Sequence, residues 1–298
     1  MHPNSKLGES ILDKHPTDLL KEVDDRVAAS LHNAGDLPPS STPTAAQAAL
    51  DHLAGKGQCI RTRLALHAGL ALHLSANDAV AIAATVELLH NASLIHDDLQ
   101  DRDRFRRGRA SVWAAFGDDV AICAGDLLLS AAFVSLAGLS NPERLAALIS
   151  LTHSRTALAI AGQCADLGAR RRRPLEVAEY ERIVAAKSGA LISLPLELVL
   201  LASGNATFCA QARRAAESFA IGYQIVDDIE DRESDARRPG ALNINAVLRE
   251  SGHEHDTLEP ARSLGLRHLS DAAAAALVLP NRCGDLLREF SLRFSARL

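Results

Sequence analysis

Two clusters of aspartate share one pattern in this chain. Residues 97–101 read Asp-Asp-Leu-Gln-Asp and residues 227–231 read Asp-Asp-Ile-Glu-Asp, so both fit D-D-x-x-D. Two other doublets, Asp24-Asp25 and Asp118-Asp119, do not extend to the pattern. One short motif can arise by chance, but two copies in one chain indicate that these aspartates carry chemistry.

The spacing within each cluster suits a divalent cation. Residues four apart lie on one face of a helix, so Asp97 aligns with Asp101 and Asp227 with Asp231. Such carboxylates repel each other unless a cation lies between them. Oxygen ligands without histidine or cysteine select hard ions, and Mg²⁺ prefers one or two carboxylates completed by water and phosphate oxygens. The clusters therefore predict magnesium bound together with a phosphorylated substrate.

Two other interpretations of the clusters stay open at this point. They can be acidic, solvent-facing helix ends without a ligand, although each follows an otherwise apolar stretch, 79–95 or 215–226. A calcium site of the EF-hand type is disfavoured, because it requires a glycine-containing loop of about 12 residues rather than helical ligands.

Long helices must carry the clusters. Alanine and leucine dominate long stretches, aromatic residues make up only 3%, and strict alternation of apolar and polar residues is almost absent. This composition predicts an all-α fold. Helix breakers group at 35–43, 140–142, 168–174, 239–240 and 280–281. No segment has the composition of a linker, so we expect a single helical domain over residues 1–298.

Composition excludes several classes of function. The formal net charge of −5 argues against a nucleic-acid-binding surface, which requires an excess of lysine and arginine. Five cysteines without a C-x-x-C pair favour a reduced, cytoplasmic protein. The N-terminus has no apolar signal region. The most apolar stretch, 189–204, contains Pro195 and Glu197 and is shorter than the roughly 20 residues of a membrane span, so we expect a soluble protein.

Further motifs follow one another along most of the chain. They are Gly55 to Arg61, Glu87 to Asp98, Arg106-Arg107-Gly108, Ala124-Gly125-Asp126, Gly162-Gln163 with Asp166, Lys187 to Ala190, and Gly222-Tyr223-Gln224. In this order and spacing they resemble the trans-isoprenyl diphosphate synthases, the polyprenyl synthetase family. The resemblance implies a helical bundle around a central cavity, and a homodimer.

The resemblance also implies a role for each matching residue. The metal ligands, which would hold three Mg²⁺ ions against an allylic diphosphate, are Asp97, Asp98, Asp101, Asp227, Asp228 and Asp231. Arg106 matches the arginine that grips the allylic diphosphate, and the residues that match ligands of isopentenyl diphosphate are Arg107, Arg61 and His90. The positions that touch the leaving diphosphate or face the allylic cation are Lys187, Ser188 and Gln224, with Gln163 and Asp166 in the same pocket.

These roles agree with the chemistry of a prenyl transfer. Breaking an allylic C–O bond separates a carbocation from a diphosphate, and magnesium, arginine and lysine stabilise the charge on that leaving group. Apolar helix walls shelter the cation from water until the alkene of the second substrate attacks it. The departing diphosphate can take the last proton, so no nucleophilic side chain is needed.

The chain departs from the family pattern in the half that binds the second substrate. Where the family has Gly-Gly-Lys-x-x-Arg-Pro, this chain has Gln58 for the lysine, Cys59 at the next basic position and Thr62 for the proline. The loop after the second cluster is short and lacks lysine; it reads Arg232 to Gly240 and then Asn243-Ile244-Asn245. Ionisation of the allylic substrate is therefore predicted more directly than chain elongation.

Product length depends on the floor of the pocket. Ser93 lies one turn before Asp97 on the same face, with Ala92 beside it, and small residues there resemble enzymes of medium and longer chain length. Phe133 is expected to close the pocket deeper down, so we expect products of about C15–C20 or longer. The alternatives are a class I terpene synthase or a prenyltransferase with another acceptor, and a non-catalytic partner subunit of a prenyl synthase.

Overall fold

A computed structural model describes residues 16–32, 44–55, 57–172, 174–231, 242–252 and 257–298. The chain divides into two compact units, residues 1–149 and 150–298. In the described residues the only strands are two of two residues each, so the all-α prediction is confirmed. The prediction of a single domain stays a prediction.

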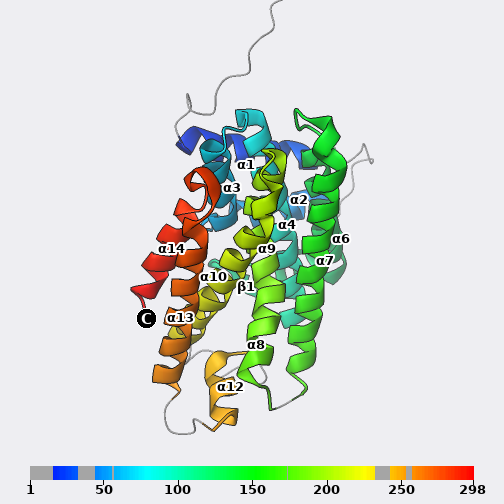
Figure 1. Cartoon of the computed structure of the whole chain (residues 1–298). Helices are drawn as coiled ribbons and strands as arrows, with labels where there is room; N and C mark the ends of the chain where they lie inside the picture. Colours follow the sequence, from blue (N-terminus) through cyan, green and yellow to red (C-terminus); the bar gives the residue numbers. More distant parts are fainter. Residues whose placement is uncertain (1–15, 33–43, 56, 173, 232–241, 253–256) are drawn as a thin grey trace, which may run out of the picture. The chain divides into compact units, whose positions relative to one another are not determined.

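The first unit is built on one long helix, α4 (Ala76–Asp101). It is apolar around most of its circumference and packs against α1, α3 and α6, as such a helix must to be buried. Figure 1 shows these helices in blue, cyan and green. The elements of this unit are α1 (Pro16–His32), α2 (Ala45–Ala54), α3 (Ile60–Ala71), α4, β1 (Phe105–Arg106), β2 (Arg109–Ala110), α5 (Val112–Phe116), α6 (Asp118–Leu136) and η2 (Pro142–Arg144).

The second unit is built on α10 (Cys209–Glu230), which packs against α9, α13 and α14. In Figure 1, α13 and α14 appear in orange and red beside the yellow α10. Phe219 on α10 contacts the ring of Phe294 on α14 at 5.9 Å between centroids. The elements are α7 (Leu145–Ala169), α8 (Val177–Val184), the π-helical turn η3 (Ala185–Gly189), α9 (Ala190–Ala202), η4 (Ala206–Phe208), α10, α12 (Ile244–Glu250), α13 (Leu258–Leu277), η5 (Pro280–Arg282) and α14 (Asp285–Ser295).

Most of the predicted helix limits are found where the breakers lie. Helix α6 ends before the break at 140–142, α7 ends inside 168–174, and α13 ends before 280–281. The breakers at 35–43 and 239–240 lie outside the described residues. Pro195 does not end a helix, because α9 continues through it.

The expectation that the protein has no membrane span stays a prediction. Four helical segments in the described part of the chain are long and apolar enough by length and composition: 76–101, 118–136, 142–169 and 177–202. In the first and the last, 72% and 78% of the apolar window is buried inside the protein. Burial in the core therefore accounts for the apolar character of these two.

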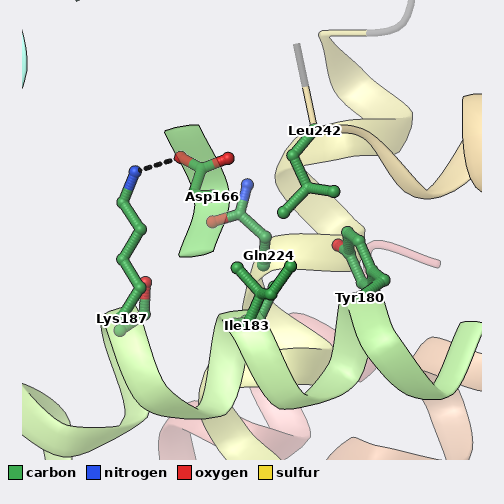
Figure 2. A pocket seen from close by; sticks show the side chains of 8 residues that line it. Asp166, Tyr180, Ile183, Lys187, Gln224 and Leu242 are labelled. Carbon is green, nitrogen blue, oxygen red and sulfur yellow. Dashed lines mark hydrogen bonds and ion pairs between the residues drawn. The ribbon is translucent and has the colours of Figure 1, made fainter. Parts of the chain in front are cut away.

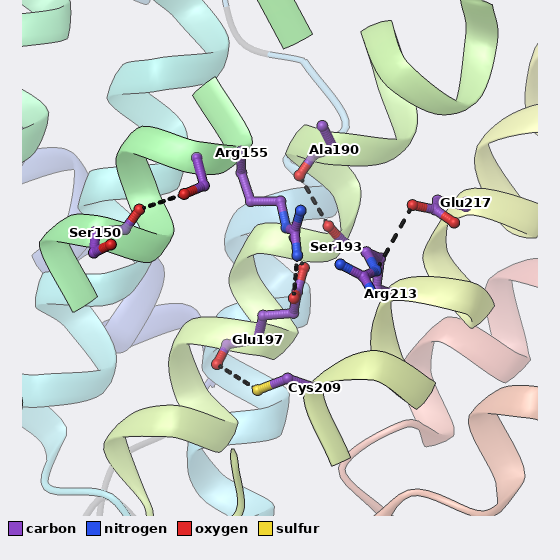
Figure 3. Close-up of polar contacts among 9 residues, drawn as sticks. Ser150, Arg155, Ala190, Ser193, Glu197, Cys209, Arg213 and Glu217 are labelled. Carbon is purple, nitrogen blue, oxygen red and sulfur yellow. Dashed lines mark hydrogen bonds and ion pairs between the residues drawn. The ribbon is translucent and has the colours of Figure 1, made fainter. Parts of the chain in front are cut away.

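A buried ion pair joins α7 to α9 within the second unit (Figure 3). Arg155 Nε donates to Glu197 Oε1 at 2.7 Å and its Nη2 donates to Oε2 at 2.8 Å. The two side chains are only 12% and 2% exposed. Because α9 is otherwise almost entirely apolar, this buried, charge-assisted pair is a specific polar contact between α7 and α9.

Removing one partner of this pair should destabilise the protein far more than removing both. Arg155→Leu leaves the Glu197 carboxylate buried without its cation, which we expect to lower the free energy of unfolding by about 3–5 kcal/mol. Arg155→Leu/Glu197→Leu should recover most of that loss, because no buried charge is left. Urea denaturation measures both values.

The matched control is Arg172→Leu, which breaks the exposed pair with Glu179. Its arginine side chain is 68% exposed, so the loss should stay below about 1 kcal/mol. Equal losses for the single and the double variant at the buried pair would contradict the expectation.

Candidate active site

The first aspartate cluster lies at the C-terminal end of α4. Asp97, Asp98 and Asp101 occupy its last turns, and Arg102 ends the helix in a left-handed conformation with φ of 57°. This end of a helix carries the negative pole of the helix dipole, which disfavours carboxylates. Three acids at this position are therefore electrostatically unfavourable until a cation binds.

Only one of the two carboxylate oxygens of Asp98 accepts a hydrogen bond within the described residues. Its side chain is 1% exposed, and Arg106 Nε donates to Oδ1 at 3.0 Å. The other oxygen, Oδ2, is buried and has no hydrogen-bond partner in the described residues. Burial raises the pKa of Asp98, and the bond from Arg106 opposes that rise. An orphaned carboxylate oxygen beside two further acids fits a hard cation as ligand.

The β1–β2 hairpin carries two arginines in different directions. Arg106 turns back to Asp98, whereas Arg107 Nη1 donates to the backbone oxygen of Gly55 at 2.6 Å. A Cβ on Gly57 would displace the Arg107 guanidinium from this position. The hairpin thus joins the Gly55–Gly57 segment to the acidic end of α4.

His90 orients Arg61 beneath the hairpin. Burial and the charge of Arg61 keep the pKa of His90 well below its ordinary value, so the ring is neutral. Its Nε2 lies 3.2 Å from Arg61 Nη1 and must accept, because a guanidinium can only donate. The predicted second-substrate residues Arg61, His90 and Arg107 therefore lie in one cluster, whereas Gln58 is exposed before α3.

His52 belongs to the same cluster, although none of the sequence motifs includes it. This residue of α2 is 9% exposed, and its Nε2 has no hydrogen-bond partner in the described part of the chain. Burial, followed by the charges of Arg107 and Arg106, lowers its pKa to about 4. A single histidine near a helix end gives no sequence signal, because its partners come from residues 91 and 106–107, far along the chain.

The predicted chain-length residues lie on α4 and α6, which pack against each other. Ala92 is fully buried and Ser93 is half-buried, with its hydroxyl donating to His90 O at 2.8 Å. Thr85 Oγ1 donates to the backbone oxygen of Ala132 at 3.2 Å. Phe133, the next residue, is therefore near the level of Thr85, about 10.5 Å before Ala92 along α4.

In the second unit, the other cluster ends α10 in the same way. Asp227 and Asp228 occupy its last turn, and Asp231 is the residue at which the helix ends. Burial raises the pKa of Asp227 to about 6, and the nearby Asp231 charge adds to the rise. Asp231 is exposed, whereas the side chain of Asp228 is buried, with 2% exposed.

A pocket next to this cluster gathers residues from four parts of the unit (Figure 2). It is lined by Asp166, Tyr180, Ile183, Val184, Lys187, Ser188, Gln224 and Leu242. Lys187 Nζ donates to Asp166 Oδ2 at 2.8 Å, while Asp166 Oδ1 is buried without a hydrogen-bond partner in the described residues. The structure thus brings together Asp166, Lys187, Ser188 and Gln224 from distant motifs.

The π-helical turn η3 positions Lys187 and Ser188 in this pocket. A Cβ on Gly162 would collide with the backbone nitrogen of Lys187, so glycine lets α7 approach the turn directly. Such turns often occur at functional sites, because the extra residue reorients the side chains around it. Gln163 follows Gly162 and is half-buried on α7.

No group of three or more His, Cys, Asp or Glu side chains in the described residues is arranged to hold a metal ion alone. Mg²⁺ does not require one, since it usually binds one or two carboxylates and completes its shell with water and phosphate oxygens. Each aspartate cluster supplies such a partial set. The donor chemistry therefore fits magnesium shared with a phosphorylated ligand.

The amino-acid sequence of the chain is similar to those of known proteins. A family model described as polyprenyl synthetase matches residues 43–241, more than half of the chain. The chain is 36% identical over 174 residues to a protein of Mycobacterium tuberculosis named (2E,6E)-farnesyl diphosphate synthase, covering 58% of this chain and 48% of that one. A short chain isoprenyl diphosphate synthase of Methanothermobacter thermautotrophicus is 31% identical over 201 residues, 67% of this chain and 62% of that one. The chain thus spans about half to three fifths of these relatives.

Solved structures show the same fold. A decaprenyl diphosphate synthase from Rhodobacter capsulatus matches with a TM-score of 0.81 at 21% identity, covering 94% of this chain and 96% of that one. An FPP/GFPP synthase from Zymomonas mobilis matches with a TM-score of 0.77 at 25% identity, covering 92% and 96%.

The buried His52 should make stability depend on pH. Its pKa falls from 6.5 to about 4 on folding, so between these values the unfolded chain binds a proton that the folded chain does not. The free energy of unfolding should therefore fall as the pH drops from 6.5 toward 4, by up to about 3 kcal/mol from this residue. His52→Gln should remove this part of the pH dependence in urea titrations.

Above pH 7 the curves of wild type and variant should run parallel, because the ring is neutral in both states there. An unchanged slope below pH 6.5 in the variant would show that His52 is not the residue responsible.

Proposed function

The chain belongs to the polyprenyl synthetase family, and we propose that it is a Mg²⁺-dependent trans-prenyltransferase that joins an allylic diphosphate to isopentenyl diphosphate. The observation that carries this proposal is the position of the two D-D-x-x-D clusters, each at the negative end of a helix and each next to a basic group. Arg106 lies beside the first, and Lys187 lines the pocket next to the second.

Each cluster would bind Mg²⁺ together with the diphosphate of an allylic substrate. Asp97, Asp98 and Asp101, with Asp227 and Asp231, would hold Mg²⁺, three ions in all. The metal supplies positive charge that stabilises the leaving diphosphate. Arg106 and Lys187 add fixed positive charge, so the C1–O bond can break with its electron pair passing to the diphosphate.

The second substrate then forms the new bond. Its terminal alkene carbon attacks the allylic C1 with the electrons of its double bond, which forms the C–C bond and leaves a tertiary cation at C3. A proton from C2 then passes to the departed diphosphate, and the C–H electrons form the new C2–C3 double bond. Arg61 and Arg107 would bind the diphosphate of isopentenyl diphosphate, with His90 holding Arg61 in place. Ser188 and Gln224 would face the allylic cation, and Gln163 and Asp166 would support Lys187.

A second candidate function rests on the altered segment before α3. Gln58 stands where the family has a lysine and is exposed, and Cys59 stands at the next basic position, so among the described residues the basic groups proposed for the isopentenyl site are Arg61 and Arg107. A prenyltransferase with another acceptor, or a class I terpene synthase, would keep the ionisation and need less charge here.

We further propose a cytoplasmic homodimer without a membrane span or nucleic-acid partner. The homodimer is supported by α6 and the 142–169 segment, which bury only 44% and 17% of their apolar windows within the described chain. A second copy would cover such surfaces. Light scattering of the purified protein would report the mass of one chain if this were wrong.

Loss of either cluster should abolish turnover. The purified protein with Mg²⁺, labelled isopentenyl diphosphate and dimethylallyl, geranyl or farnesyl diphosphate should give longer labelled products. Asp97→Ala and Asp227→Ala should each reduce this rate at least ~100-fold, because each removes charge that stabilises the leaving group. The control Asp25→Ala changes an exposed doublet outside the pattern and should retain the wild-type rate.

No label in any longer product, together with diphosphate release from the allylic substrate, would replace elongation by the second candidate. Near-normal rates in both alanine variants would refute the metal-assisted mechanism.

Bulk near the first cluster should shorten the product. Ser93→Phe places a ring on a half-buried position one turn before Asp97, and Ala92→Phe does so in the core, where overpacking costs about 1–3 kcal/mol. Both should stop the chain near C15. Phe133→Ala should act in the opposite direction and lengthen it, as chromatography of the dephosphorylated products would show. Unchanged lengths in all three variants would place the floor elsewhere.

A further inference from the structure

The carboxylate of Asp228 is already surrounded by donors. Tyr180 donates its hydroxyl to Oδ2 at 2.8 Å, and the backbone nitrogen of Ile244 donates to the same oxygen at 2.7 Å. Gln224 Nε2 donates to Oδ1 at 2.9 Å. An ionised carboxylate oxygen has two lone pairs, so both positions on Oδ2 are used. This aspartate therefore ties α8, α10 and the start of α12 together.

The backbone of Asp228 takes part in the same network. Asn243 Nδ2 and Asn245 Nδ2 both donate to its carbonyl oxygen, at 3.3 and 3.1 Å. Asn245 is in turn held by the hydroxyl of Thr257 at 3.0 Å. The Asn-Ile-Asn sequence at 243–245 thus serves to anchor α12 on the end of α10.

Asp228 also points away from the face that its neighbours share. Asp227 and Asp231 lie one turn apart, whereas Asp228 is about 100° around the helix from Asp227. Asp228 is 2% exposed, while Asp231 is exposed and Asp227 is intermediate. Because Asp228 is 2% exposed and Tyr180, Ile244 and Gln224 donate to its oxygens, a magnesium ion that keeps part of its water shell would have to compete with these donors.

We infer that Asp228 is a positioning residue rather than a ligand of magnesium, and that it sets the side chains of Gln224 and Tyr180 in the wall of the pocket in Figure 2. The inference deepens the proposed function and rests on it for the nature of the substrate. Because Asp228 holds the amide nitrogen of Gln224, the amide oxygen is the polar atom that this residue can turn toward the pocket. A carbonyl oxygen there stabilises a developing cation, whereas an amide N–H would oppose it.

Tyr180 is suited to a fixed donor role. It is fully buried, and burial together with the charge of Asp228 raises its pKa well above the ordinary value, so its hydroxyl keeps its proton. The same tyrosine lies seven residues, about two turns, before Lys187, on the helix α8 that leads into η3. Holding it therefore also holds the segment that carries Lys187 and Ser188.

The test compares Asp228→Asn with Asp227→Asn in two measurements. In the first, the rate of product formation is followed as the Mg²⁺ concentration rises. Asp228→Asn should lower kcat about tenfold, as loss of an orienting partner does, with the Mg²⁺ concentration for half-maximal rate within about twofold of wild type. Asp227→Asn should raise that concentration about tenfold or more.

The second measurement needs no turnover. Mg²⁺ with inorganic diphosphate should raise the thermal unfolding temperature of wild type, and Asp228→Asn should keep this rise whereas Asp227→Asn should lose it. If wild type forms no product, the proposed function fails, but this comparison still decides the role of Asp228. Loss of the rise in Asp228→Asn, or a Mg²⁺ requirement shifted as in Asp227→Asn, would overturn the inference.

Tyr180→Phe covers the case in which Asp228→Asn does not fold. It removes one hydroxyl and should lower kcat without changing the Mg²⁺ requirement. The double variant should be no slower than Asp228→Asn alone, because both changes break one network. A normal kcat in Tyr180→Phe, or additive losses in the double variant, would contradict the inference.

Discussion

Negative charge gathered at the negative end of a helix is the constraint on which this structure depends. Both α4 and α10 end in aspartates, where the dipole and the repulsion between carboxylates one turn apart act in the same unfavourable direction. Burial is the main cause of the raised pKa of Asp98 and of Asp227, about 6 for Asp227, and the charges of neighbouring aspartates add to both rises. A cation relieves the repulsion, and a diphosphate brings the oxygens that complete the cation's shell. Binding of metal and binding of substrate are therefore expected to support each other.

Glycines near these helix ends allow close approach of other segments. Gly57 admits the Arg107 guanidinium, and Gly162 admits the backbone of η3, so two basic side chains approach positions that a Cβ would close. Burial then decides protonation: His52 and His90 stay neutral beside Arg61, Arg106 and Arg107, so the positive charge in this cluster is carried by the guanidinium groups. Arginine at such sites cannot lose its proton, so the affinity for a diphosphate does not depend on a titrating lysine.

The sequence predicted what depends on local pattern. The apolar stretches before each cluster do form α4 and α10, and the family motifs placed Asp166, Lys187, Ser188 and Gln224 in what proves to be one pocket. It failed where distant segments decide the outcome. Nothing near His52 in the sequence shows that Arg107 will lie beside it. The hydroxyl of Tyr180 gave no signal, because its partner is 48 residues away in the chain.

The two clusters have the same pattern, yet their central residues differ in environment. Asp98 Oδ1 accepts from Arg106 and its Oδ2 has no hydrogen-bond partner in the described residues, so one oxygen stays available for a cation. Asp228 is equally buried, but a tyrosine, a glutamine and a backbone nitrogen occupy its oxygens. A motif specifies which side chains are present and on which helix. The donors that other segments bring to each carboxylate decide whether it binds a metal or holds the protein together.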